Sequence, residues 1–380
     1  MIGSAIESGG SIGDVHARGR RAARWVPRWH FGLPVTLSIL GLLFLYSTTY
    51  TGWFPSRTVL FQVLWLVIAV ALYHFLSRIN LGVRPSSSVL LFWPIEILLI
   101  ATLLIGWAVH GSSRWLKVGP LTIQPSEFAK FFAILLLAYF FSACVRSEEH
   151  RRFWWALLVL IAMIIPILRQ PDLGTAMVFV LVFLSIIYVK PLPWRYLVGI
   201  IIALVIVAVP GWFMLKDYQR ARIVSFFQPS RDPLGSGYHV SQSKIAIGSG
   251  GMWGKGFRAG TQTQGQFIPV QAADFIFATI GEEWGFIGVV IVFVLFGYLF
   301  ILIYTLARKV QSDYQRLVVF GVLATLFFQL FINVGMTVGL TPVTGLPLPF
   351  LSYGGSSMLT MWALMALLAS IERHLPTRTP

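Results

Sequence analysis

Apolar segments that are each long enough to cross a membrane recur along almost the whole chain. Hydrophobic residues make up 57% of the 380 residues and charged residues only 11%, which leaves too few polar side chains to cover a water-facing surface. A helical span of a bilayer needs roughly 17–25 residues. The pattern predicts an all-α, polytopic integral membrane protein with about ten transmembrane helices, at Leu33–Tyr50, Thr58–Leu76, Val89–His110, Phe128–Cys144, Trp154–Leu168, Leu173–Val189, Tyr196–Leu215, Phe286–Ala307, Leu317–Leu340 and Ser356–Ile371.

The apolar runs define one membrane domain between two tails. We expect residues 1–32 to form a disordered, basic cytoplasmic tail, residues 33–372 a single transmembrane domain, and residues 373–380 a second cytoplasmic tail. The first run is too long for the core of a cleavable signal peptide, so it is expected to remain as a helix. Residues 216–274 form a large predicted extracytoplasmic loop between the seventh and eighth helices.

The placement of lysine and arginine predicts the orientation. Short cytoplasmic connections carry an excess of these residues, and an even number of spans puts both termini on one side. That side holds the basic N-terminal segment and other basic connections, so both termini are expected in the cytoplasm of a multi-pass inner (cytoplasmic) membrane protein. The net charge of +15 follows from this bias and indicates no nucleic-acid partner. Anionic membrane lipids are the expected partners of the basic tail.

Four polar stretches on the opposite side interrupt the apolar pattern. They are SSRWLKVGPLTIQPSEFAK, RQPDLGT, the 216–274 loop and TPVTGLPLPFLSYGGSS. Irregular backbone at membrane depth is tolerated only where protein buries it or where it lines a cavity, so these stretches are expected to converge on one outward-facing site. Asp274 is the leading candidate within it. It lies where the long loop re-enters a membrane helix, and a carboxylate there is costly unless a partner or substrate compensates for it.

Other acidic residues in these stretches have two interpretations each. Glu127 and Lys130 lie three apart on one helical face, where they form either a structural ion pair or a substrate contact. Asp172 precedes a helix and is expected to cap it, which is compatible with binding. Glu282 and Glu283 follow Asp274 by about two helical turns, and they belong either to the site or to a water-filled groove or the cytosolic surface.

Cations and hydroxyl groups on the same face complete the candidates. The Gly-rich run IAIGSGG with WGKG lacks the spacing of a phosphate-binding P-loop, and we interpret it as a close turn whose amides, together with Lys244 and Lys255, would meet a diphosphate. Arg220 and Arg222 add two more cations. Ser352 has no histidine partner of the kind that covalent catalysis needs. The single cysteine excludes an intramolecular disulfide and a thiolate metal cluster.

Taken together and in this order, the polar stretches resemble the SEDS family of shape, elongation, division and sporulation proteins. The matching motifs are RWLKVGPLTIQPSEFAK, QPDLGTA, QSKIAIGSGG, ADFIFATIGEE and PVTGLPLPFLSYGGSSM. The run IAIGSGG followed by GTQTQ is more similar to the elongation (RodA) branch than to the division (FtsW) branch. The resemblance implies a ten-helix peptidoglycan glycosyltransferase that polymerises lipid II for cell elongation and rod shape. It also implies a class B penicillin-binding protein (a transpeptidase) and other elongation-complex membrane proteins as partners.

By that resemblance Asp274 is the catalytic residue. Five further residues fall on motif positions that line the central cavity of the family: Trp115, Glu127, Lys130, Asp172 and Ser352. The chain departs from the family directly before the acid. Where the family reads Pro-Glu-x-His-Thr-Asp, this chain has Val270, Gln271, Ala272 and Ala273 between Pro269 and Asp274. The polar neighbours of the acid are therefore missing.

The expected reaction is an inverting glycosyl transfer between two lipid-linked disaccharide diphosphates. Asp274 would act as general base toward the acceptor 4-hydroxyl, an assistance worth about 10²–10⁴-fold. Lysine and arginine of the long loop, or a divalent cation (Mg²⁺ or Mn²⁺) held by Asp274 with substrate oxygens, would neutralise the leaving diphosphate. No metal site made by protein ligands alone is expected. Two alternatives remain: a flippase for the lipid-linked precursor, and a catalytically weak scaffold for the penicillin-binding protein.

Overall fold

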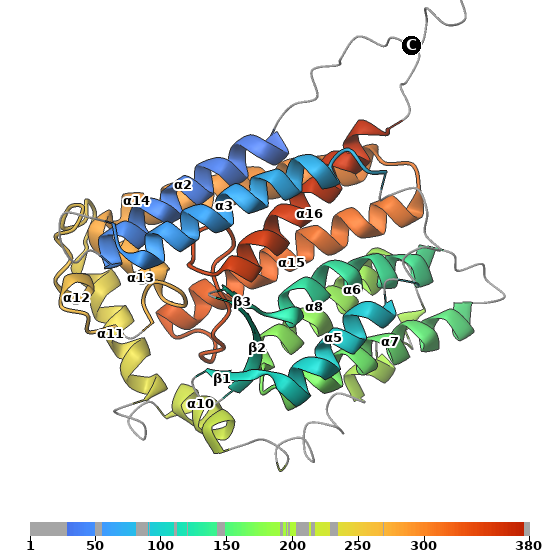
Figure 1. The fold of residues 1–380 in the computed structure, drawn as a ribbon, viewed down its shortest axis with the longest axis horizontal. Helices are drawn as coiled ribbons and strands as arrows, with labels where there is room; N and C mark the ends of the chain where they lie inside the picture. The colour runs from blue at the N-terminus through green and yellow to red at the C-terminus, as the bar shows by residue number, and fades with distance from the viewer. Residues whose placement is uncertain are drawn as a thin grey trace, which may run out of the picture.

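The protein is a bundle of helices in the computed structural model (Figure 1). The structure describes residues 29–49, 55–80, 90, 92–109, 112–119, 121–142, 149–190, 193–194, 196, 198–202, 213, 217–228, 235–268 and 270–375. Seven helices in these residues are long and apolar enough to span a membrane: α2 (Trp29–Thr49), α3 (Arg57–Leu76), α6 (Pro125–Ser142), α7 (Glu149–Arg169), α14 (Gly285–Lys309), α15 (Asp313–Val338) and α16 (Gly355–Arg373). Two shorter apolar helices are α5 (Phe92–Ile105) and α8 (Leu173–Val189).

These helices confirm the prediction of a polytopic helical membrane protein. Each of them covers most of one predicted span, whereas the predicted span Tyr196–Leu215 lies largely outside the described residues. The first helix begins at Trp29, so residues 29–32, which were expected in the disordered tail, are helical. The remainder of both predicted tails is outside the described residues except for Arg373, which ends α16, and residues 374–375.

Two buried helices, α15 and α16, form the centre of the bundle. Helix α16 packs against α2, α3 and α6, and α15 packs against α6, α8 and α14. In Figure 1, α2, α3 and α14 lie on one side of this pair and α5 to α8 on the other. Small residues allow the closest contacts: a Cβ atom built at Gly355 would overlap the Trp65 ring. The polar groups that α15 and α16 carry are therefore held within protein and away from lipid.

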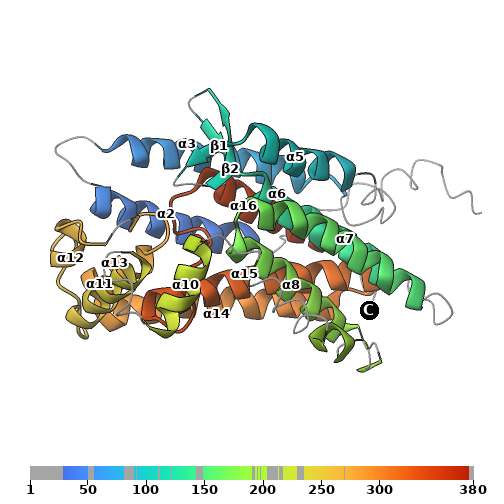
Figure 2. The same cartoon turned by 90° about the horizontal axis from the view of Figure 1, so that it is seen from below.

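A small antiparallel sheet follows α5. Its strands are β1 (Trp107–Val109), β2 (Ser112–Val118) and β3 (Leu121–Ile123), in the order β1-β2-β3. Figure 2 shows the sheet beside α5 and α6, which β2 contacts. The prediction of one helix from Val89 to His110 is therefore wrong at its C-terminal end. The chain leaves the helix after Ile105, and Gly119 (φ 61°) permits the turn that brings β3 back against β2.

The predicted extracytoplasmic loop is largely folded. Within residues 216–274 the described part contains α10 (Asp217–Phe227), α11 (Ser236–Ser249) and α12 (Thr261–Gln264). The short helix α13 (Ile276–Glu283) follows and leads into α14 after a break at Trp284. Helices α11, α12 and α13 lie together at one end of the bundle in both views (Figures 1 and 2). Helix α11 contacts α13 and α15, so this part of the loop packs directly against the bundle.

Candidate functional site

Asp274 lies on a tight turn immediately before α13. The backbone N–H groups of Ala273 and Asp274 both donate to the carbonyl of Val270, at 3.1 and 3.0 Å. Val270 itself has a φ of 54°, which is an uncommon conformation for a β-branched residue. The Asp274 side chain is partly exposed. Its carboxylate faces Gly345, where an added Cβ atom would lie 3.4 Å from Asp274 Oδ2.

The backbone of this turn is bound to the segment between α15 and α16. The side-chain amide of Asn333 donates to the carbonyl of Asp274 at 3.0 Å and to the carbonyl of Leu346 at 2.7 Å. The N–H of Tyr353 donates to the carbonyl of Ala272 at 3.0 Å. The turn that carries the candidate catalytic acid is thus fixed relative to residues 341–354.

Glu127 and Lys130 form a buried ion pair at the start of α6. Lys130 Nζ lies 2.8 Å from Glu127 Oε1, and each side chain is 2% exposed. The ion-pair interpretation is therefore confirmed. Lys130 also donates to Gln329 Oε1 at 3.0 Å, and Gln329 Nε2 donates to the carbonyl of Pro347 at 2.9 Å. This pair is consequently connected to the same segment that holds Asp274.

Asp172 caps α8, as the sequence predicts. Its carboxylate accepts hydrogen bonds from the backbone N–H and the hydroxyl of Thr175, at 3.2 and 3.0 Å. It also accepts from Gln124 Nε2 at 2.9 Å and from the Ser126 hydroxyl at 3.3 Å, and Arg114 on β2 lies 3.6 Å away. Since a carboxylate has about four acceptor positions, this network occupies the group.

Ser352 and Trp115 both make contacts with other parts of the protein. The Ser352 hydroxyl accepts a hydrogen bond from the backbone N–H of Leu348 at 2.8 Å, and its carbonyl accepts from Gln62 Nε2 at 3.2 Å. Trp115 is half-buried on β2, where it pairs with Trp107 of β1. Both positions support the polar stretches, while a direct contact with substrate stays a prediction.

The four polar stretches converge, as predicted. Residues 345–356 connect to all three groups: Asp274, the Glu127–Lys130 pair and the Asp172 network. The Asp172 network is connected through the Ser356 hydroxyl, which accepts from the N–H of Gln124 at 2.8 Å. The pocket beside Lys130 has an empty volume of about 190 Å³ and is otherwise lined by α6, α8 and α15. The buried carboxylates are closed off in this conformation.

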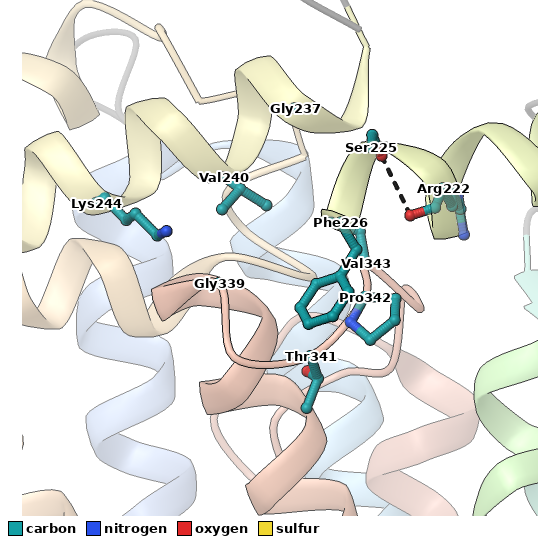
Figure 3. Close-up of a pocket in the computed structure, with 10 residues that line it drawn as sticks. All are labelled: Arg222, Ser225, Phe226, Gly237, Val240, Lys244, Gly339, Thr341, Pro342 and Val343. Carbon is teal, nitrogen blue, oxygen red and sulfur yellow. Dashed lines mark hydrogen bonds between the residues drawn. The ribbon is translucent and has the colours of Figure 1, made fainter. Parts of the chain in front are cut away.

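A second pocket lies between α10, α11 and the start of the 341–354 segment (Figure 3). Its empty volume is about 330 Å³, and residues 339–343 form one wall. Two cationic residues line it, Lys244 of α11 and Arg222 of α10. The other predicted cation, Arg220, does not line this pocket, and its guanidinium donates to the carbonyl of Phe213 at 2.6 Å. The structure thus places Lys244 and Arg222 in the lining of one pocket, on opposite sides in Figure 3.

The Gly-rich run is a packing element. A Cβ atom at Gly250 or Gly254 would overlap backbone carbonyls of α13. The N–H groups of Lys255 and Gly256 donate to the carbonyls of Glu282 and Glu283, both at 3.0 Å. Lys255 Nζ binds the Glu282 carboxylate at 2.8 Å. These amides and this lysine are already paired within the protein, so the expectation that they meet a diphosphate is not supported.

Glu282 and Glu283 are fully buried, which excludes the two alternatives of a water-filled groove and the cytosolic surface for both. Glu282 accepts hydrogen bonds from the backbone N–H groups of Gln262 and Thr263, at 2.8 and 2.9 Å. Glu283 accepts one from the Ser47 hydroxyl. Burial acts to raise the pKa of Glu282, but its bonds with Lys255, Gln262 and Thr263 hold that pKa below the usual value. The pair fastens the loop to the bundle.

No group of three or more His, Cys, Asp or Glu side chains among the described residues is arranged to hold a metal ion. At Asp274 the protein would supply a metal ion with one carboxylate ligand, and substrate and water would supply the remaining ligands. The divalent cation therefore remains a prediction.

Several site residues were missed by the sequence reasoning. Gln329 and Asn333 are fully buried amides on α15, four residues apart in an apolar helix. Gln124 and Ser126 contact Asp172, and they come from a stretch where the sequence reasoning considered only Trp115, Glu127 and Lys130. Polar side chains inside an apolar span are the signal that identifies the first pair, because such groups must be paired within the protein.

Comparisons with known proteins agree with these motifs. The family model described as "Cell cycle protein", which covers FtsW, RodA and SpoVE, matches residues 28–377. Peptidoglycan glycosyltransferase MrdB of Escherichia coli (strain K12) is 36% identical over 311 residues, 81% of this chain and 83% of that protein. A chain from a solved complex, "Structural coordination of polymerization and crosslinking by a peptidoglycan synthase complex", is similar with a TM-score of 0.76 and 30% identity, over 90% of this chain and 96% of that chain. The rod shape determining protein RodA of Thermus thermophilus is similar with a TM-score of 0.69 and 26% identity, over 93% and 99%.

Proposed function

The chain belongs to the SEDS family of FtsW, RodA and SpoVE proteins and is a peptidoglycan glycosyltransferase of cell elongation, and we propose that it polymerises lipid II with Asp274 as the general base. It is a multi-pass protein of the inner membrane. One observation carries the assignment of the base. Asp274 is the partly exposed carboxylate, while Glu127 and Asp172 are buried within hydrogen-bond networks of their own.

The proposed step is a single displacement at the anomeric carbon of the donor sugar. The 4-hydroxyl oxygen of the acceptor forms the new glycosidic bond as the bond from the anomeric carbon to the diphosphate oxygen breaks. The hydroxyl proton passes to the Asp274 carboxylate, and undecaprenyl diphosphate leaves with the bonding electrons. Because the diphosphate is already a good leaving group, the protein needs to supply a base and positive charge, and no acid is required.

The pocket of Lys244 and Arg222 is the proposed source of that positive charge. It adjoins the site of Asp274, because Val343 lines the pocket and also packs against the cluster that contains Phe275. Arg220, on the same helix as Arg222, adds charge nearby without lining the pocket. A divalent cation such as Mg²⁺ or Mn²⁺, bound to Asp274 and to substrate oxygens, would supply the same neutralisation.

The other predicted site residues, four of them buried and Trp115 half-buried, have a supporting role in this proposal. In this proposal they hold in place the elements beneath the substrate. These are the sheet (Trp115), the start of α6 (Glu127 and Lys130), the start of α8 (Asp172) and the 341–354 segment (Ser352). We propose that lipid II contacts these five residues when the bundle opens around the buried carboxylates of Glu127 and Asp172. The lipid tail would lie between helices in the bilayer, where it stays in an apolar environment.

The proposed partners follow from the solved complex. That structure concerns a peptidoglycan synthase that coordinates polymerisation with crosslinking, which supports a class B penicillin-binding protein as the partner of this chain. Other membrane proteins of elongation are further proposed partners. The bias of lysine and arginine supports an orientation with both termini in the cytoplasm and Asp274 on the outer face.

The experiment is polymerisation of labelled lipid II by the purified protein with its class B penicillin-binding protein. We compare wild type with Asp274→Asn and with Asp313→Asn, a control in which a half-exposed carboxylate far from the site is lost. Loss of glycan strands in Asp274→Asn alone, with the complex intact, is expected. If Asp274→Asn keeps wild-type activity, Asp274 is not the base. If wild type also makes no polymer while binding its partner, the flippase and scaffold alternatives replace the proposal.

A further inference from the structure

Helix α15 carries two side-chain amides on one face, Gln329 and Asn333, both completely buried. Residues four apart on a helix project from the same side. Asn333 contacts Asp274, and Gln329 contacts Lys130. Each amide also contacts the 341–354 segment. The two contacts to that segment fall on adjacent residues, the carbonyls of Leu346 and Pro347.

Asn333 makes its contact to the residue that carries the proposed base. Its amide nitrogen has two N–H groups, and they donate to the carbonyls of Asp274 and Leu346 at 3.0 and 2.7 Å. The side-chain orientation follows from these partners, because a flipped amide would set its oxygen against two carbonyl oxygens. Both donor positions of the amide are therefore used to hold Asp274 against the 341–354 segment.

Gln329 performs the matching function one turn earlier. Its oxygen accepts from Lys130 at 3.0 Å, and its nitrogen donates to the carbonyl of Pro347 at 2.9 Å. The Glu127–Lys130 pair and Asp274 are consequently both connected to the backbone of residues 345–347. Gly345 at the start of that stretch has a φ of 75° and faces the Asp274 carboxylate.

We propose that Asn333 is a positioning residue for the glycosyl transfer: it fixes the backbone of Asp274 and so sets the direction of the catalytic carboxylate, while Gln329 fixes the Lys130 end of the same frame. This inference rests on the proposed role of Asp274. It also accounts for the departure before the acid. With Val270, Ala272 and Ala273 in place of polar neighbours, the described residues orient the turn through backbone bonds such as those from Asn333 and Tyr353.

The chemistry needs this kind of fixation. A general base has to lie within hydrogen-bond reach of the proton it removes, and a displacement of about 1 Å can cost a factor of 10² in rate. Loss of the Asn333 bonds would allow the turn to shift without removing the carboxylate. The expected signature is a lower kcat with an unchanged KM, because the substrate-binding surfaces are elsewhere.

The test measures kcat and KM for lipid II, with melting temperature, for Asn333→Leu and Asn333→Asp in complex with the partner. Leucine removes both donors at similar size, and aspartate keeps the shape but retains at most one donor. Thr337→Val is the matched control. Thr337 is equally buried one turn later on α15, but its hydroxyl donates only within its own helix, to the carbonyl of Val334.

We expect both Asn333 variants to lower kcat by about tenfold or more, with KM within about twofold of wild type, and Thr337→Val to behave as wild type. If Asp274→Asn is inactive but Asn333→Leu and Asn333→Asp keep kcat within about twofold, the positioning role is wrong while the proposed function stands. A fall in kcat only for Asn333→Leu, with a matching fall in melting temperature, assigns Asn333 to packing and also overturns the inference. If Asp274→Asn is active, the proposed function itself fails.

Discussion

Replacement of Glu282 by glutamine should release the 255–264 segment from the bundle. Glu282 Oε1 accepts from Lys255 Nζ and from the N–H of Gln262, both at 2.8 Å. Its Oε2 accepts from the N–H and the hydroxyl of Thr263, at 2.9 and 2.7 Å. Glutamine replaces one of these oxygens with an N–H₂ group, so at least one obligate donor, the Thr263 N–H or both Lys255 Nζ and the Gln262 N–H, faces a donor whichever way the amide is turned.

The magnitude follows from the number and kind of these bonds. Hydrogen bonds to a charged group contribute about 1.5–3 kcal/mol each, and removing one partner of a buried ion pair costs about 3–5 kcal/mol. We expect a loss of about 3–5 kcal/mol in the free energy of opening this segment, which raises its open population by about a hundredfold or more.

Limited proteolysis of the purified protein within residues 255–268 measures that population directly, with the melting temperature as a second readout. Asp313→Asn is the control, because both partners of Asp313 are at least partly exposed and such pairs contribute about 0–1 kcal/mol. Cleavage of Glu282→Gln at the wild-type rate would refute the reasoning.

The same contact predicts a dependence on pH. The pKa of Glu282 in the folded protein lies below its usual value because of its bonds, although burial opposes them. Its stabilising contribution is therefore complete above the pKa of an unfolded glutamate and is lost as the pH falls through the lower, folded pKa. Wild type should become more sensitive to protease over that acidic range, and Glu282→Gln should not.

Two further predictions concern packing and charge. Gly355→Ala should destabilise the protein by about 1–3 kcal/mol, since its Cβ atom overlaps the Trp65 ring and α16 must move away from α3; thermal unfolding checks this, with Gly297→Ala, which meets no neighbouring atom, as the control. Lys244→Ala, and more strongly the double variant with Arg222→Ala, should raise the KM for lipid II, since both line the pocket beside the site. Unchanged KM in the double variant would exclude that pocket from diphosphate binding.

Much of the fold could be predicted because its signals are local. A run of apolar residues specifies a membrane helix from its own length, and this gave α2, α3, α14, α15 and α16 close to their observed ends. The Glu127–Lys130 pair and the Asp172 cap were predictable for the same reason, since both depend on residues within one turn of a helix.

Other features depend on residues distant in the sequence. Whether Arg220 or Arg222 lines the pocket of Lys244 depends on how α10 is rotated against α11 and on the wall that Gly339, Thr341, Pro342 and Val343 form. The Gly-rich run has the composition of an anion-binding loop, and only the contacts of Gly250 and Gly254 with α13 identify these two glycines as packing residues. The β-sheet after α5 likewise required pairing between strands, which an apolar run does not reveal.

The sequence by itself determined the membrane helices, their order and the identity of Asp274 as the carboxylate to examine, because desolvation in a bilayer penalises any other arrangement of so apolar a chain. Only the tertiary structure decided what holds that carboxylate. Asn333 reaches Asp274, and Gln329 reaches Lys130, across gaps of 59 and 199 residues. Contacts of this kind arise from the packing of α15 in the centre of the bundle, where every buried amide must find its partners within the protein.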